Sequence, residues 1–299
     1  MNLPTLDTIV LDTINTYQNA ENLPQIDFSQ FHAPLVVGSG NGIATGKILF
    51  RNIPAFFASE SEVEEKLRNI PSIEEVVVVS ASGEKHAPII LELAEKMGKK
   101  TFLISSSETS PARTIADTSF VFPKNTEPYT YNTSTYFGYL YGAEANRELS
   151  KLRDHITQTI DAILSNIDWK SYTGYIVVLP NEFALLRDMI EMKFIELFGR
   201  KLARDVFTYE QMKHAITVVP DDRELFLCFG NETGIQYGTN QVNLPVFDTQ
   251  SYAAMMLVGY YTVGKIQGVL PSYFMDSIEK YCETAPEKFG FHPSPIVKA

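Results

Sequence analysis

Short apolar runs alternate with helix-forming stretches through the first half of the chain. Apolar residues recur at helical spacing from Leu6 to Tyr17, which predicts a leading helix within residues 1–24. The strands predicted after it are 35–37, 55–58, 75–80, 101–104 and 119–122. The helices predicted between them are 42–50, 61–69, 86–97 and 110–116. Repeated strand–helix units of this length predict a doubly wound α/β domain, in which ligands bind at the carboxyl ends of parallel strands.

The second half of the chain shows the same alternation in weaker form. An apolar stripe from Leu149 to Ile167 first predicts a helix that connects the two halves. The elements predicted after it are strands at 175–179, 205–207 and 224–229 and helices at 182–198 and 249–266. We therefore expect a degenerate structural repeat. The expected bounds are 25–166 for a first domain that includes the connecting helix, 167–270 for a second domain, and 271–299 for a C-terminal tail.

Composition narrows the functional class. Apolar residues make up 44 % of the 299 residues and charged residues 20 %, as in ordinary globular proteins. The 25 Lys and Arg residues face 36 Asp and Glu residues, so we expect neither nucleic acid nor a membrane as a partner. The two cysteines, Cys228 and Cys282, lack the spacing of a zinc site. The sequence shows no signal peptide, so a cytoplasmic location is expected.

Two predicted strand-to-helix turns carry residues suited to an anion. The segments are Gly38–Gly42 and Ser80–Lys85. At such turns the backbone N–H groups lack helical partners and the helix dipole favours negative charge. The candidate phosphate-binding residues are Gly40, Asn41, Gly42, Ser80, Ser82, Gly83 and Lys85. The alternative is that these turns only cap helices. Neither turn has the spacing of a Rossmann or P-loop motif, which disfavours a dehydrogenase or an NTPase.

Glu196 and His214 are the candidate catalytic residues of the second half. Glu196 lies on the apolar stripe of a predicted helix, and a partly desolvated carboxylate suits a general base. The alternative is a structural acid paired with Lys193 or Arg200, which stand at helical contact spacing. His214 follows a short polar segment, and a single histidine is by itself an unspecific signal.

These motifs together resemble the SIS (sugar isomerase) family of phosphosugar-binding proteins over about residues 25–270. The segments that carry the resemblance are Gly38–Gly42, Ser80–Glu84, Thr126–Ser134, Lys193–Glu196 and Glu210–His214. The layout is similar to the isomerase domain of glucosamine-6-phosphate synthase, fructosamine deglycases and phosphoglucose/phosphomannose isomerases. It implies an α/β fold of two tandem SIS domains, each a doubly wound, flavodoxin-like parallel sheet flanked by helices.

The resemblance also implies residue roles. Ser80, Ser82, Gly83 and Lys85 would bind a sugar phosphate, although Gly42 and Lys85 replace residues that often carry hydroxyl groups in the family. Glu196 matches the glutamate that abstracts a proton, and His214 matches the histidine that opens the sugar ring. The remaining implied site residues are Glu127 and Thr133 near the sugar hydroxyls and Lys298 as a Schiff-base former in the tail. The turns after 175–179 and 224–229 lack serines, so one phosphate site per chain is expected.

The implied activity is interconversion of aldose and ketose hexose phosphates, or amino sugar phosphates, through a cis-enediol. This chemistry requires no metal or nicotinamide cofactor. A homodimer is expected, because the family histidine commonly reaches the neighbouring subunit's site. Two alternatives stay open. One is a fructosamine-type deglycase or amino-sugar-phosphate deaminase that uses a Schiff base, and the other is a non-catalytic phosphosugar sensor.

Overall fold

The computed structural model describes residues 3–144, 148–215, 221–231 and 234–299. Contacts between Cα atoms divide the chain into two compact units. The five-strand unit comprises Asn19–Asn125 and Ser134–Arg147. The four-strand unit comprises Met1–Gln18, Thr126–Thr133 and Glu148–Ala299. The chain therefore crosses between the units more than once, and each unit is described by itself below.

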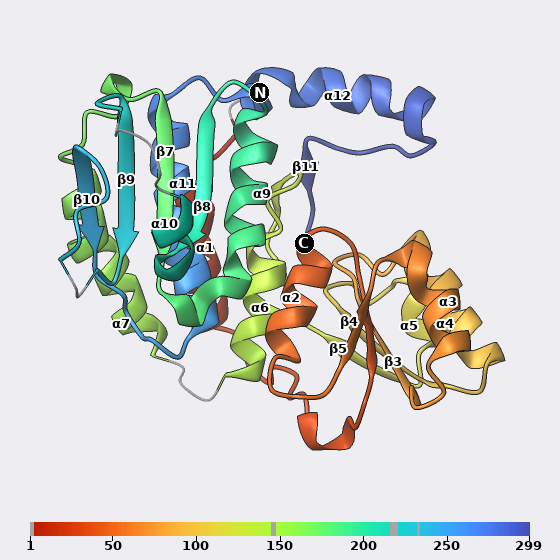
Figure 1. Ribbon diagram of the computed structural model, residues 1–299. Helices are drawn as coiled ribbons and strands as arrows, with labels where there is room; N and C mark the ends of the chain where they lie inside the picture. Colours follow the sequence, from red (N-terminus) through yellow and green to blue (C-terminus); the bar gives the residue numbers. More distant parts are fainter. Residues whose placement is uncertain (1–2, 145–147, 216–220, 232–233) are drawn as a thin grey trace. The chain divides into compact units, whose positions relative to one another are not determined.

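The five-strand unit is built on a parallel sheet with the order β2-β1-β3-β4-β5, of which Figure 1 labels β3, β4 and β5. Its strands are β1 (Leu35–Val37), β2 (Phe56–Ala58), β3 (Glu75–Val79), β4 (Lys100–Ser105) and β5 (Thr118–Val121). Its helices are α2 (Asn41–Leu49), α3 (Val63–Asn69), α4 (His86–Lys96), α5 (Pro111–Ile115) and α6 (Thr133–Ala143), with 3₁₀ turns at Phe28–Gln30 and Glu60–Glu62. This order is that of flavodoxin-like folds, in which ligands bind at the switch point between β1 and β3, where the order of the strands reverses.

Alternate residues of β3 bury opposite faces of this sheet. Val76 and Val78 belong to one core cluster together with residues of α3, α4 and α5, such as Leu91. On α2, a Cβ placed at Gly46 would lie 2.7 Å from a methyl group of Val36 on β1, so glycine allows this helix to approach the sheet closely. Burial on both faces explains why four consecutive valines, Val76–Val79, make up most of β3.

The four-strand unit has a parallel sheet with the order β10-β9-β7-β8 (Figure 1). Its strands are β7 (Gly174–Leu179), β8 (Ala203–Thr208), β9 (Glu224–Phe229) and β10 (Asn240–Leu244). The first, second, third and fourth strands of this unit are thus arranged in space as β1, β2, β3 and β4 are in the other unit. A separate antiparallel pair joins β6 (Glu127–Pro128) to β11 (Ile296–Val297). The predicted α/β class with parallel sheets flanked by helices is thus confirmed.

The helices of the four-strand unit include the first and the last helix of the chain. They are α1 (Leu6–Gln18), α7 (Leu149–Asp154), α8 (Asp161–Leu164), α9 (Arg187–Phe198), α10 (Tyr209–Ala215), α11 (Tyr252–Val269) and α12 (Tyr273–Phe289). A π-helical turn, His155–Ile160, joins α7 to α8, and 3₁₀ turns cover Trp169–Ser171 and Asn181–Leu186. The leading helix is tied to α11 by a hydrogen bond from the Leu6 N–H to Gln267 Oε1 at 2.9 Å.

Several elements differ from the predicted ones. The connecting helix ends at Leu164 and belongs to the four-strand unit, whereas the predicted bounds group it with the first sheet. The predicted helix 182–198 begins as a 3₁₀ turn, and α9 starts at Arg187. Strand β10 was missed because Asn240, Gln241 and Asn243 give this edge strand a polar sequence. Helix α6 was missed because residues 134–142 are buried all round and show no apolar stripe.

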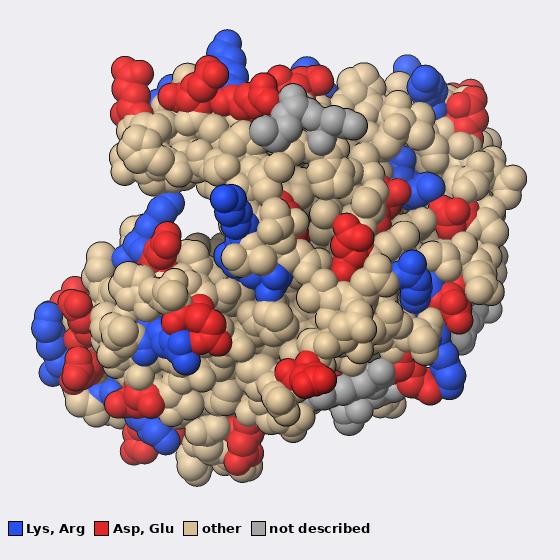
Figure 2. All heavy atoms as spheres, turned by 180° about the vertical axis from the view of Figure 1, so that it is seen from behind, with Lys and Arg blue, Asp and Glu red and all other residues tan. Residues whose placement is uncertain are grey.

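The surface of the described residues mixes charges of both signs. Figure 2 shows Lys and Arg side chains interspersed with Asp and Glu on the face that it draws, without an extended basic area among the described residues. Among those residues, no helix has the length and apolar character that a membrane span requires.

Candidate functional site

The two predicted anion-binding turns meet at the carboxyl edge of the five-strand sheet. Strands β1 and β3 are direct neighbours, with Val37 paired to Val78. The turn that follows β1 ends at Gly40, the N-cap of α2, and Asn41 and Gly42 begin that helix; the turn that follows β3 is Ser80–Lys85. Because parallel neighbours end at the same edge, the sheet order brings the two turns together at its topological switch point.

Close backbone packing explains why the first turn contains glycine. A Cβ placed at Gly42 would lie 2.7 Å from the carbonyl oxygen of Val79, and a Cβ at Gly38 would lie 3.0 Å from the same oxygen. Real Cβ atoms do not approach backbone oxygens this closely, so a serine at position 42 would push α2 away from β3. The departure from the family pattern at Gly42 therefore has a packing cause.

The Ser80–Lys85 turn is held by its own hydroxyl groups. The N–H of Gly83 donates to Ser80 Oγ at 3.1 Å, and the N–H of Glu84 donates to Ser82 Oγ at 3.3 Å. Gly83 has φ +64°, and a Cβ there would lie 2.5 Å from Ser110 Oγ. Glycine is thus required at this position by both backbone conformation and space.

The polar groups of this turn that face solvent can bind an anion. The side chains of Ser82 and Lys85 are exposed, while Ser80 is half-buried, and Lys85 occupies the N-cap of α4 with φ +51°. The helix dipole of α4 adds positive potential there. Pro88, the third residue of α4, has no N–H. Side chains must therefore supply more of the hydrogen-bond donors to an anion than at the start of a helix without proline.

In the four-strand unit, a fully buried lysine holds Glu196. Lys193 and Glu196 both lie on α9, and Lys193 Nζ donates to Glu196 Oε2 at 2.6 Å. The same ammonium donates to the carbonyl oxygen of Thr130 at 2.5 Å and lies over the ring of Tyr260. The Lys193 side chain is 0 % exposed, whereas Glu196 keeps 22 % exposure. The ion pair between Glu196 and Lys193, which their spacing on the helix allowed, is therefore present. Glu196 still remains accessible to solvent.

The backbone beside this ion pair is strained. Thr130 has φ +76° and Asn132 has φ +45°, a region that side-chain-bearing residues rarely adopt. A left-handed conformation costs roughly 1–2 kcal/mol for such residues. The hydrogen bond from Lys193 to the Thr130 carbonyl is one of the contacts that hold this segment in place. Backbone strain of this kind clusters at functional sites.

The predicted residues Glu127, Thr133 and Lys298 lie on segments that contact one another. Glu127 is 4 % exposed and accepts a hydrogen bond from the N–H of Thr133 at 2.7 Å. Glu127 is also paired with Val297 in the β6–β11 ladder, and the Ala299 N–H donates to Thr126 Oγ1 at 3.1 Å. These two contacts flank Lys298, so the exposed lysine is held beside the Glu127 strand and not frayed from it.

A cavity of about 500 Å³ opens beside Glu196 within the four-strand unit. Its lining includes Tyr129, Thr130 and side chains of α12 such as Ser277 and Tyr281. Burial is the main cause that raises the pKa of Tyr129 to about 12, with smaller contributions from Tyr281, Cys282 and Glu196. The lining thus combines hydroxyl groups, the carboxylate of Glu196 and the ammonium groups of Lys280 and Lys288, all of which can bond a polar ligand.

His214 lies on a different part of the four-strand unit. It is the penultimate residue of α10, and its side chain is exposed. Two other α10 residues, Glu210 and Lys213, line a second cavity that does not include Glu196. The described cavities therefore do not bring His214 and Glu196 together within one chain.

Lys193 and helix α12 contribute to the Glu196 region, and sequence reasoning did not select them as site residues. The spacing of Lys193 and Glu196 is a usable signal, because residues three apart on a helix are neighbours. By contrast, α12 is an amphipathic helix without any motif of its own, and only the folded chain shows that Tyr281 and Ser277 line the cavity.

Comparison with solved structures identifies the fold. A glucosamine-6-phosphate deaminase from Thermotoga maritima matches with a TM-score of 0.58 and 14 % identity, over 88 % of this chain and 92 % of that one. The C-terminal domain of glucosamine-fructose-6-phosphate aminotransferase from Francisella tularensis matches with a TM-score of 0.59 and 15 % identity, over 88 % of this chain and 94 % of that one. Tagatose-6-phosphate ketose/aldose isomerase from Escherichia coli matches with a TM-score of 0.54 and 14 % identity, over 88 % of this chain and 86 % of that one.

The chain thus has the fold of phosphosugar isomerases and deaminases, and the predicted resemblance to the SIS family is confirmed at the level of the fold. No family model and no curated protein matches the sequence. The individual residue roles therefore depend on the local geometry given above.

Proposed function

We propose that this protein is a phosphosugar isomerase of two tandem SIS domains, which interconverts the aldose and ketose phosphates of a hexose or an amino sugar. The observation that supports this most strongly is the meeting of the Gly38–Gly42 and Ser80–Lys85 turns at the switch point of the five-strand sheet. Ligands of doubly wound folds bind at that position. The similar solved structures include enzymes of sugar phosphates.

In this proposal the Ser80–Lys85 turn binds the phosphate of the substrate. The Ser82 hydroxyl donates to a phosphate oxygen, and the Lys85 ammonium and the dipole of α4 balance its charge. Ser80 shapes the turn through its bond with the Gly83 N–H. From the neighbouring strand-to-helix junction, exposed Gly40 would approach the anion, while Asn41 and Gly42 are buried beside it.

Glu196 acts as the general base. Its carboxylate removes the proton from C1 of the ketose, the electron pair forms the C1–C2 double bond of a cis-enediol, and the carbonyl oxygen at C2 gains a proton. Return of the proton to C2 with loss of the O1 proton gives the aldose. Lys193 is a positioning residue, because its ion pair fixes the Glu196 carboxylate without touching the substrate.

His214 and the Glu127 strand complete the proposed site. A neutral imidazole can take the proton of the anomeric hydroxyl and return it to the ring oxygen, which opens the ring. The exposed position of His214 on α10 supports a role in the site of the partner subunit of a homodimer. Glu127 and Thr133 would contact the sugar hydroxyls.

One observation favours a second candidate, a deaminase or deglycase that uses an imine. The contacts of Val297 and Ala299 hold Lys298 beside Glu127. An amine in a fixed position next to a carbonyl substrate can attack it with loss of water and form a Schiff base. In that case Lys298 would be the nucleophile and Glu196 would move the proton.

Proton exchange separates these functions. The protein is incubated with fructose 6-phosphate in D₂O, and the aldose product is examined by ¹H NMR for deuterium at C2. We expect exchange that Glu196→Gln abolishes and that Glu191→Gln, a control on the same helix, preserves.

Ser82→Ala should raise KM about tenfold, because it removes one charge-assisted hydrogen bond. Borohydride trapping of a sugar on the parent but not on Lys298→Ala would instead select the imine enzyme. Binding of hexose phosphates without exchange or trapping would select the sensor and reject the isomerase.

A further inference from the structure

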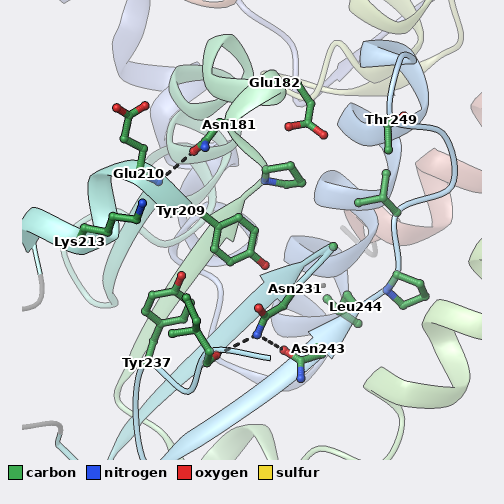
Figure 3. Close-up of a pocket in the computed structure, with 15 residues that line it drawn as sticks. Asn181, Glu182, Tyr209, Glu210, Lys213, Asn231, Tyr237, Asn243, Leu244 and Thr249 are labelled. Carbon is green, nitrogen blue, oxygen red and sulfur yellow. Dashed lines mark hydrogen bonds between the residues drawn. The ribbon is translucent and has the colours of Figure 1, made fainter. Parts of the chain in front are cut away.

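A second cavity lies at the carboxyl edge of the four-strand sheet (Figure 3). Strands β7 and β9 are its central neighbours, as β1 and β3 are in the other sheet. Pro180, Asn181 and Glu182 follow β7, while Gly230 and Asn231 follow β9. These residues line a cavity of about 860 Å³, within the range of small-molecule sites. We call it the second-sheet pocket.

The second-sheet pocket lacks the features of a phosphate site. The N–H of Gly230 is already used, because it donates to the carbonyl oxygen of Leu244 at 2.8 Å. Asn181 Oδ1 accepts the N–H of Glu210 at 2.9 Å, which uses one donor at the start of α10. The described lining carries two carboxylates, Glu182 and Glu210, against the single ammonium of Lys213. Net negative charge repels an anion and attracts a cation.

Several polar groups of the pocket have no partner in the described chain. The side chains of Glu182, Glu210 and Lys213 make no hydrogen bond or ion pair with any described residue, although Glu210 and Lys213 are three positions apart on α10. Figure 3 draws these three side chains, with the Glu210 carboxylate turned away from Tyr209 and Asn231. They can therefore receive hydroxyl and amino groups of a ligand without breaking internal contacts.

The rest of the lining combines two tyrosines and three amides with apolar residues such as Leu244 and Val246. The rings of Tyr209 and Tyr237 lie side by side, with centroids 5.8 Å apart (Figure 3). Tyr209 is fixed by its hydroxyl, which donates to the Phe229 carbonyl at 2.7 Å. Asn231 Nδ2 donates to Asn243 Oδ1 at 3.1 Å, which orients both amides. Fixed aromatic faces beside oriented amides and carboxylates suit a ligand with apolar C–H faces and several hydroxyl groups.

We propose that the second-sheet pocket binds a small polyhydroxylated amine without phosphate, of which an unphosphorylated amino sugar is the simplest example. The amine pairs with Glu182, hydroxyl groups bond to the amides and Lys213, and the carbon skeleton lies against the tyrosine rings. This site is separate from the phosphate-binding turn of the proposed isomerase and does not depend on that activity.

Isothermal titration with D-glucosamine tests the proposal, with D-glucose as the uncharged comparison. We expect glucosamine to bind at least about tenfold more tightly than glucose, because only the amine gains a carboxylate partner. Glu182→Gln should weaken glucosamine binding about tenfold and leave glucose binding unchanged. Tyr237→Ala should weaken both sugars. Glu95→Gln, at an exposed site on α4, is the matched control and should change neither affinity.

A second set of titrations keeps this proposal distinct from the proposed function. The Ser80→Ala/Ser82→Ala double variant should lose fructose 6-phosphate binding and retain glucosamine binding. Loss of glucosamine binding in that variant would place the sugar on the phosphate-binding turn and overturn the second site. Equal affinities for glucosamine and glucose, absence of glucosamine binding, or glucosamine binding that Glu182→Gln and Tyr237→Ala both leave unchanged would overturn it as well.

Discussion

Replacement of Lys193 by methionine tests the ion pair that holds Glu196. The ammonium is fully buried and bonds both Glu196 Oε2, at 2.6 Å, and the Thr130 carbonyl, at 2.5 Å. Removal of one partner from a buried ion pair costs about 3–5 kcal/mol. Glu196 is 22 % exposed and can regain water, so we expect the low end of that range. The free energy of unfolding should therefore fall by about 3 kcal/mol.

Urea unfolding followed by circular dichroism measures this loss. Lys193→Met, Glu196→Gln and the double variant form a mutant cycle, and the double variant should lose less than the sum of the single variants, with a coupling of about 2 kcal/mol. Lys96→Met, at an exposed lysine on α4, should change stability by less than about 0.5 kcal/mol. If Lys193→Met were as stable as the parent, or if the losses of the two single variants simply added in the double variant, the ion pair with Lys193 would not hold Glu196.

Three further predictions concern single residues. Gly42→Ser should destabilise the protein by about 1–3 kcal/mol, because the Cβ of the serine would lie 2.7 Å from the Val79 carbonyl oxygen. Thermal unfolding measures this loss, and Gly268→Ser, at a position where a Cβ has open space, is the control. Thr130→Gly should raise stability by about 1 kcal/mol by relieving φ +76°, and an unchanged or lower unfolding midpoint would contradict the assigned strain. Burial raises the pKa of Tyr129 from 10.0 to about 12, so its neutral form contributes stability below pH 10 that is lost as the pH rises through 12. Tyr129→Phe should remove this loss, and parallel stability curves for parent and variant between pH 10 and 12 would refute it.

Most of the fold was predictable because its strands are buried. Four valines follow Glu75 in β3, and β9 was predicted with its observed bounds, since after the first glutamate both strands are apolar and buried. The polar edge strand β10 and the two-residue strands β6 and β11 lack that signature. The pairing of β6 with β11 joins residues far apart in sequence, which no local pattern can reveal.

The candidate site was predictable only where a motif marks it. The Ser80–Lys85 turn could be located because serine and glycine directly follow a buried strand. The apolar stripe around Glu196 gave no indication that Lys193 bonds the Thr130 carbonyl, because that contact depends on tertiary packing. The second-sheet pocket carries no serine motif, and the order of the sheet is what reveals its position.

A crystal structure with bound fructose 6-phosphate is the most direct test of the proposed function. We predict that the phosphate lies on the Ser80–Lys85 turn and accepts a hydrogen bond from the Ser82 hydroxyl. A phosphate bound elsewhere, with this turn empty, would contradict the assignment of the site.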